Sequence, residues 1–300
     1  MQKVSTQMPK ECPIYHSQYF YHASAYGLAG EIERPVRQSV PAQAACTLAS
    51  GGGRGTQRTD RFCVSPFICF DSAYTEVGGS FDECHNKHTT YAYSVVEGLN
   101  IADVLTADRV VSRMVVYSPE VGDEDGEHSY DITGSHFVNL RLAGHPIDVK
   151  LSTHTFHAHD TYSKFEKAYH GDQADDLLPW GSQSEKQLSE LEKLEDQYHA
   201  LRGVGKRAKA WKKQPQRPKG GLYWCSAAGH LDLRNTIDQS ELQGFGGLIV
   251  IPKFGLVRLA QVLVHRDYRR LTMFHVQMCS GSSGSSDGGG TSSGGGRPFP

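Results

Sequence analysis

Three histidines and an aspartate gather in a polar stretch near the middle of the chain. His154, His157, His159 and Asp160 occupy the pattern H-x-x-H-x-H-D, and imidazole and carboxylate groups are ligands that zinc takes from proteins. An H-x-H-x-D-H pattern would present two imidazoles and a carboxylate to one metal-bound water, whereas here the aspartate comes one position early with no histidine after it. If residues 156–169 are helical, His157 and His159 point about 200° apart, so one helix face cannot chelate a metal with both.

These residues therefore have two interpretations. The first is a polar, His-rich helix start with Asp160 near its first turn, in which case the protein needs no cofactor. The alternative is a metal-dependent enzyme that uses zinc or another divalent metal. The sequence contains no P-loop, Rossmann glycine pattern or nucleophile elbow, so we predict no catalytic residues.

A basic segment with one tryptophan forms a second candidate site. Lys206–Lys219 contains seven lysine or arginine residues and no acidic residue. Cations beside an aromatic ring can bind phosphates and stack on a base, which makes a nucleic-acid or anionic-surface binder an alternative function. The same composition describes an exposed linker, and on that interpretation nucleic-acid binding is not expected. The residues available for interaction are Lys206, Arg207, Lys209, Trp211, Lys212 and Lys213.

The chain ends in a segment rich in glycine and serine. Ser280–Pro300 has the composition of a flexible tail and closes with an apolar group around Phe299. An extended strand with few side chains, ended by a phenylalanine, would suit a groove or sheet edge of the next copy. Such head-to-tail contacts propagate into rings or filaments.

The seven cysteines are odd in number, widely spaced and contain no C-x-x-C pair. This pattern is typical neither of a disulfide framework nor of a zinc ribbon. Cys63 and Cys69 lie in an apolar, strand-like run, where a free cysteine behaves as a small hydrophobic residue. We therefore predict reduced, structural cysteines.

Charge and hydropathy restrict the possible classes of protein further. The formal net charge is −2, so no overall field attracts the molecule to nucleic acid or membrane. The sequence lacks any apolar run long enough for a membrane span, and its first residues lack the apolar region of a secretory signal. Two locations are therefore compatible with the sequence: the cytoplasm, or the cell exterior after export without a standard leader.

Strand patterns dominate both ends of the chain. Residues 19–26, 61–70, 89–98 and 99–119 are β-branched or aromatic, and Pro66 makes the second of these an edge strand, a bulge or two short strands. Residues 51–59 are expected to form a mobile loop, and residues 137–151 a hairpin with a four- or five-residue turn. Leucines recur every three or four residues over 183–201, which predicts an amphipathic helix.

We expect a mainly β fold, an antiparallel sandwich or barrel-like, with a helical insertion, and therefore α+β overall. The predicted parts are an N-terminal arm (1–14), a first β part (15–151), a helical insert with the basic loop (152–220), a second β part (221–279) and the tail (280–300). The alternative is two separate domains divided near Ser152.

Two motifs resemble a known family. VEGLNIADVLTADRVVSR (Val96–Arg113) and GSHFVNLRLAGHPIDV (Gly134–Val149) resemble bacterial β-rich proteins of the choice-of-anchor P type. GGLIVIPKFGLVRLAQVLV is similar to a later strand pair of related chains, so the resemblance covers about residues 92–151 and 245–275. It implies a β fold of bacterial, often surface-associated origin, and no activity.

Together these observations predict a non-catalytic, self-assembling structural or surface protein. Its main partner would be another copy of the same chain, in a homo-oligomer or filament, with the tail docked on the neighbouring subunit.

Overall fold

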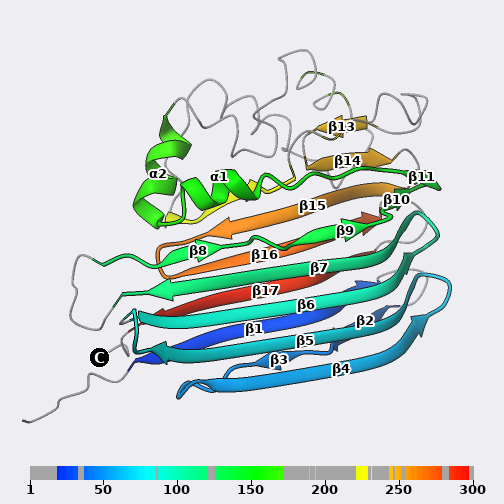
Figure 1. The fold of residues 1–300 in the computed structure, drawn as a ribbon. Helices are drawn as coiled ribbons and strands as arrows, with labels where there is room; N and C mark the ends of the chain where they lie inside the picture. The colour runs from blue at the N-terminus through cyan, green and yellow to red at the C-terminus, as the bar shows by residue number, and fades with distance from the viewer. Residues whose placement is uncertain are drawn as a thin grey trace, which may run out of the picture.

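A computed structural model of the protein describes residues 19–32, 37–85, 87–119, 126–171, 189, 193, 221–228, 231, 243–245, 247–251, 254–278 and 284–296. Two antiparallel β sheets lie face to face, and two short helices run along one side of them (Figure 1). This confirms the prediction of a mainly β fold with a helical insertion. In the described part of the chain, no helix is long and apolar enough to cross a membrane.

Sheet A contains the first and the last strand of the chain as neighbours. Its order is β13-β14-β15-β16-β17-β1-β2, with β12 paired to β15 and β3 paired to β1. Its strands are β1 (Phe20–Ile32), β2 (Gln38–Gln43), β3 (Cys46–Thr47), β12 (Tyr223–Ser226), β13 (Gln243–Phe245), β14 (Leu248–Ile251), β15 (Gly255–Val264), β16 (Tyr268–Met278) and β17 (Gly284–Gly296).

Sheet B consists of consecutive hairpins. Its order is β11-β10-β7-β6-β5-β4, with β8 and β9 also paired to β7. Its strands are β4 (Gly53–Val64), β5 (Ile68–Asp82), β6 (Lys87–Ile101), β7 (Leu105–Ser118), β8 (Ser129–Asp131), β9 (His136–Val138), β10 (Arg141–Leu142) and β11 (His145–Pro146).

The sheets pack closely because small residues line much of their shared interior. A Cβ atom added at Gly27 of β1 would lie 2.6 Å from the Cβ atom of Ala73 in β5. Side-chain hydroxyls of sheet B also donate hydrogen bonds across the interface to backbone carbonyls of residues 26 and 44. Ser94 Oγ donates to the carbonyl of Tyr26 at 2.9 Å, and Thr75 Oγ1 donates to that of Ala44 at 2.6 Å. The interior is therefore narrow and contains satisfied polar groups among its apolar ones.

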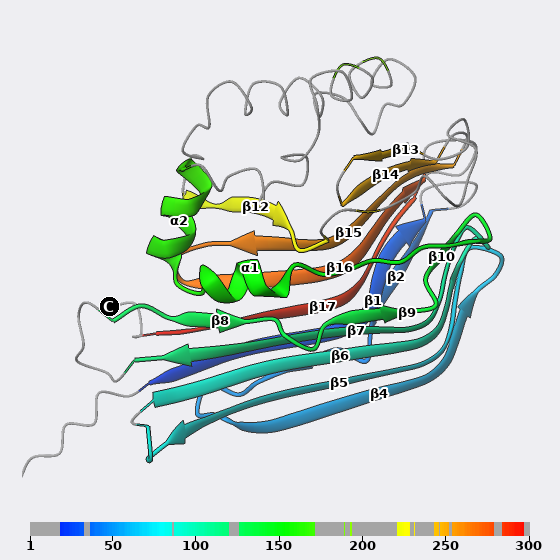
Figure 2. The same ribbon diagram turned by 45° about the horizontal axis from the view of Figure 1, so that its top comes forward.

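A single glycine lets β6, one of the longest strands of sheet B, continue through a change of direction. Gly98 has φ 62°, a conformation that glycine adopts without steric cost. The buried residues of β6 fall on even positions from Thr90 to Val96, with Val95 buried as well, and on odd positions at Leu99 and Ile101. The predicted strand 89–98 therefore does not end at Gly98, because β6 extends to Ile101 and bends, as the curled end of the sheet shows in Figure 2.

The helical insert leaves the sandwich and returns to it at adjacent points. Leu151 forms an isolated antiparallel bridge with Ala228, and the amide of Ser152 donates to the carbonyl of Ala227 at 2.7 Å. Between them come α1 (Thr153–Ala158) and α2 (Tyr162–His170), which lie beside β8 and β15 (Figure 2). Buried aromatic rings of both helices join the main core: Phe156, Phe165 and Tyr169.

Two local predictions are wrong in detail: the loop 51–59 and the turn length of the hairpin in 137–151. The expected loop 51–59 is mostly strand, because β4 begins at Gly53 and pairs with β5 along its length. The division of residues 61–70 at Pro66 agrees with the alternative of two strands, since Pro66 lies in the turn between β4 and β5. The amide of Phe67 donates to the carbonyl of Val64 in this turn, and the amide hydrogen that proline lacks is not needed between the strands. The hairpin of β10 and β11 has a two-residue turn at Ala143 and Gly144, both with positive φ, which is shorter than expected.

Several predicted segments lie outside the described residues. They are the arm 1–14, the basic segment Lys206–Lys219, the C-terminal Phe299 and, apart from residues 189 and 193, the predicted helix 183–201.

Candidate functional site: the C-terminal strand and its slot

The prediction of a flexible tail is wrong for most of the Gly/Ser segment. Residues Gly284–Gly296 form β17, which pairs antiparallel with β1 on one side and with β16 on the other. In Figure 1 this strand, coloured red, runs between them in sheet A. We call the space between β1 and β16, with the facing strands β6 and β7 of sheet B, the β17 slot. The amino-acid composition indicated disorder because composition carries no information about the backbone hydrogen-bond partners that neighbouring strands supply.

Register explains why glycine suits this slot. Gly288 lies opposite Leu28 of β1 and Phe274 of β16, and both of these side chains are fully buried. Residues directly opposite one another in antiparallel strands share a face of the sheet, so position 288 belongs to the inner face. A large side chain there would have to enter a space that Leu28 and Phe274 already fill, and packed interiors resist such insertions.

The strand is attached mainly through its backbone. Glycine has low strand propensity, and β17 consists only of glycine, serine, threonine and one aspartate. These residues bring little apolar surface of their own, while the strand pairs with β1 from Gly284 to Gly296 and with β16 from Gly284 to Gly294, with a single break at Gly289 in both registers. A strand held this way keeps its hydrogen bonds in any slot of the same shape.

One edge of each sheet carries features that oppose edge-to-edge pairing. The edge strand β4 carries Arg54, Arg58 and Arg61, all exposed, and β2 at the edge of sheet A contains Pro41. Charges and proline on edge strands are common means of preventing strand addition.

The predicted metal cluster is not assembled. His154 and His157 lie on α1 with exposed side chains, His159 is the C-cap of that helix, and Asp160 is bonded to Lys164 Nζ at 2.9 Å. Among the residues that the structure describes, no group of three or more histidine, cysteine, aspartate or glutamate side chains is arranged to hold a metal. His159 lies beyond the last helical residue of α1, so the three histidines do not share one regular helix.

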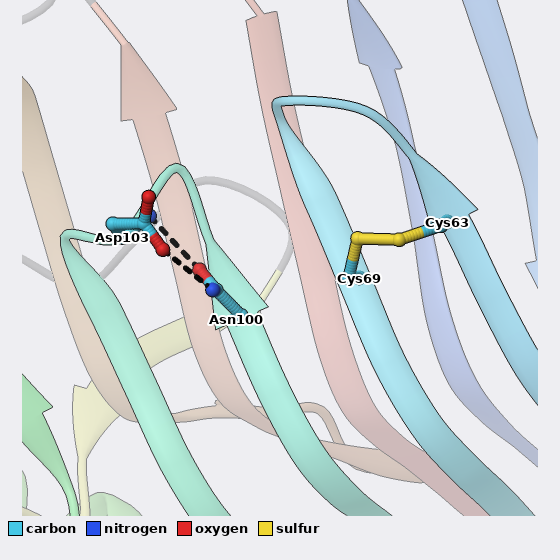
Figure 3. Close-up of a disulfide and its surroundings, with 4 residues drawn as sticks. All are labelled: Cys63, Cys69, Asn100 and Asp103. Atoms are coloured by element: carbon cyan, nitrogen blue, oxygen red, sulfur yellow. Dashed lines mark hydrogen bonds between the residues drawn. A yellow bond between two sulfur atoms is a disulfide. The ribbon is translucent and has the colours of Figure 1, made fainter.

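The prediction of reduced cysteines is wrong for one pair. Cys63 of β4 and Cys69 of β5 are directly opposite across their hairpin and form a disulfide, with Cα atoms 4.2 Å apart (Figure 3). The two were read as members of one strand, whereas the turn at Pro66 folds them together. Cys46, Cys84 and Cys225 are free.

The disulfide lies at a rim of tight turns. In the neighbouring β6–β7 turn, Ala102 and Asp103 have positive φ, and Asn100 fixes this conformation by bonding to the amide and the carboxylate of Asp103 (Figure 3). The amide of Ala102 donates to the carbonyl of Phe67 at 2.7 Å. The rim therefore joins the β4–β5 and β6–β7 hairpins beyond the ends of their strands.

A buried arginine is a candidate site residue that the sequence analysis did not single out. Arg269 of β16 is 1% exposed, and its guanidinium carbon lies 4.3 Å from the ring centroid of Tyr130. Burial lowers the pKa of Arg269 to about 10. The alternation of β16 marks position 269 as an inner one, and an arginine there was the available signal.

A polar network on the outer face of sheet B was also not predicted. Glu76 of β5 accepts hydrogen bonds from Arg54 at 2.8 Å, Tyr74 at 2.7 Å and Tyr91 at 2.6 Å. The bond from Arg54 is the main cause that lowers the pKa of Glu76 to about 2, with Tyr74 and Tyr91 adding to it. Tyr91 lies over Gly78, since a Cβ atom added there would meet its ring.

These features define an antiparallel β sandwich with a helical insertion and a Gly/Ser-rich central strand. The family model described as "Domain of unknown function (DUF8256)" matches residues 19–265, and the chain belongs to this family. Comparisons with curated proteins and with solved structures return no match.

Proposed function

We propose that this is a non-catalytic, self-assembling structural or surface protein, in which β17 of one copy docks in the β17 slot of the next. The observation that carries the proposal is the place of β17. It is the last described strand of the chain, it lies between β1 and β16 in the interior of sheet A, and it is built of small residues.

A strand with these properties suits exchange between copies. Its removal would leave two unpaired strand edges facing one another, and an extended segment of another chain can satisfy both with main-chain hydrogen bonds. The same strand fits its own slot and a neighbour's equally well, and the high effective concentration within one chain favours the closed form at low protein concentration. Head-to-tail exchange is heterologous, so it propagates as a filament unless a ring closes.

The disulfide supports a role outside the reducing cytoplasm. Structural disulfides persist mainly in secreted and surface proteins, and Cys63–Cys69 bridges a hairpin at the exposed rim. This agrees with the surface-associated origin that the resemblance to choice-of-anchor P proteins implies.

Cysteine cross-linking between two different variants tests the exchange directly. Ser24 of β1 and Ser292 of β17 are directly opposite in the register. In a Cys84→Ser background, Ser24→Cys and Ser292→Cys are placed in separate chains, mixed at high concentration and oxidised. We expect a disulfide-linked dimer on a non-reducing gel, because only an exchanged β17 brings the two sulfurs together.

Pairing Ser24→Cys with Ser286→Cys provides the matched control, because Ser286 lies opposite Gly30 instead. This mixture should give far less dimer. Equal yields from both mixtures, or a wild-type protein that stays monomeric by light scattering at every concentration, would refute the proposal.

A further inference from the structure

Arg269 occupies an electrostatically incomplete position between the insert and the sandwich. Its side chain is 1% exposed and lies over Tyr130 of β8, with the ring of Phe165 from α2 5.6 Å away. Its one hydrogen bond in the described structure runs from Nη2 to the carbonyl of His159, at 3.3 Å. A buried cation with so little compensation is costly, so buried charges are normally paired.

The nearest carboxylates are engaged elsewhere. Asp160 accepts a hydrogen bond from Lys164 Nζ at 2.9 Å. Glu127 accepts from both the amide and the hydroxyl of Ser163, at 3.0 and 2.6 Å. Both act on Arg269 through space, but the described residues place no carboxylate within ion-pair distance of its guanidinium.

Two buried donors at this place also lack acceptors. Arg269 Nε and the hydroxyl oxygen of Tyr130 are buried and have no hydrogen-bond partner. Tyr130 as a whole is only 2% exposed. The guanidinium lies over the ring that bears this hydroxyl, so both donors belong to one small region. Unsatisfied buried polar groups are rare, and an ion or water bound beside them is a usual reason for their presence.

We propose that a small inorganic anion of the size of chloride binds at this junction, with Arg269 as its counter-charge and the Tyr130 hydroxyl as a second donor. The anion would neutralise the buried guanidinium and supply the missing acceptor. Because the Arg269 side chain contacts β8, α2 and the residue that ends α1, the bound anion would strengthen the attachment of the insert to the sandwich. This inference does not depend on strand exchange.

The test measures the Tm of the full-length protein in chloride and in gluconate at equal ionic strength. Chloride is small enough to be enclosed, whereas gluconate is not. A tenfold excess of chloride over its dissociation constant should raise the Tm by about 3–6 °C. Inorganic phosphate forms a third arm, and a shift in phosphate but not in chloride would overturn the size assigned to the site.

Variants and a heavier halide locate the effect. Arg269→Met and Tyr130→Phe should each abolish or reduce the chloride-dependent shift, while Arg113→Met, which removes an arginine on the outside of sheet B, should retain it. Crystals grown in bromide should show its anomalous peak within hydrogen-bond distance of Arg269 Nε. Equal Tm values in chloride and gluconate, or a bromide-free junction, would overturn the proposal and leave the donors to water.

Discussion

β6 and β17 are both flanked by strands on two sides, but they are held in opposite ways. The inner face of β6 carries buried side chains that pack against sheet A, among them Val96 and Leu99. β17 is mostly glycine and serine and depends on its neighbours' backbones. The comparison teaches that a central strand can be specified by its surroundings rather than by its own residues, and the proposed function depends on that property of β17.

The largest effect is expected from a charge placed in β6. Val96→Asp would bury an unpaired carboxylate at a site with no exposure, which costs several kcal/mol (about 4 or more). We expect no cooperative unfolding transition by circular dichroism. Glu97→Asp, at the exposed neighbouring position, should unfold like the wild type, and a folded Val96→Asp variant would mean that β6 is not core.

A bulky residue in β17 should separate assembly from folding. Gly288→Phe would clash with the buried positions of Leu28 and Phe274 and destabilise the docked strand by about 3 kcal/mol. We expect a folded protein by circular dichroism, with faster hydrogen exchange in β1 and no oligomers by light scattering. Ser292→Phe, opposite the half-buried Ser24 and Arg270, is the matched control and should still assemble.

Removal of the disulfide should lower the stability by an intermediate amount. The bond fixes an edge hairpin covalently, whereas β17 is held without a covalent link in the described structure. Replacing both Cys63 and Cys69 by serine releases a loop of sequence separation 6, for which chain entropy gives about 2 kcal/mol. The expected fall in Tm is about 4–8 °C. Cys84→Ser, at an exposed free cysteine, should leave Tm unchanged, and an equal fall there would indicate a different pairing.

The smallest effect is expected from the outer network around Glu76. The folded pKa of about 2 lies below the ordinary value of 4.5, so the network stabilises the folded state above pH 4.5 and this contribution is lost as the pH falls toward 2. Glu76→Gln should reduce the acid sensitivity of Tm in that window by at most about 2 °C, since the partner Arg54 is exposed. Glu97→Gln serves as a control, and an identical change in both variants would show that the network has no special role.

The sequence predicted those elements whose side chains reveal their environment. Strands β1, β6 and β7 and the β character of residues 221–279 were visible because β-branched and aromatic residues mark buried strands, and the insert was visible through its change of pattern. The first part of β4, residues 53–59, was missed because an exposed edge strand needs few apolar residues, and its glycines and arginines indicated a loop. Gly98 was taken as an end because a bend shifts the alternation without breaking the strand.

The candidate sites were harder to predict, since they depend on residues that are distant in the sequence. β17 shows no strand signal of its own and needs β1 and β16 on either side. Arg269 meets Tyr130 and Phe165 only because the insert packs on the sandwich. The disulfide required knowledge of a turn between two cysteines that a linear reading placed on one strand.

The bridge between Leu151 and Ala228 has a consequence for how this family can vary. A chain that departs and re-enters at adjacent points can be lengthened without separating the strands on either side, provided that the buried rings of α1 and α2 keep their places in the core. The entropy of closing such a loop grows only logarithmically, so doubling it costs about 0.6 kcal/mol. Relatives should therefore tolerate large differences in length here, and this junction is the natural place to graft a reporter domain onto the sandwich.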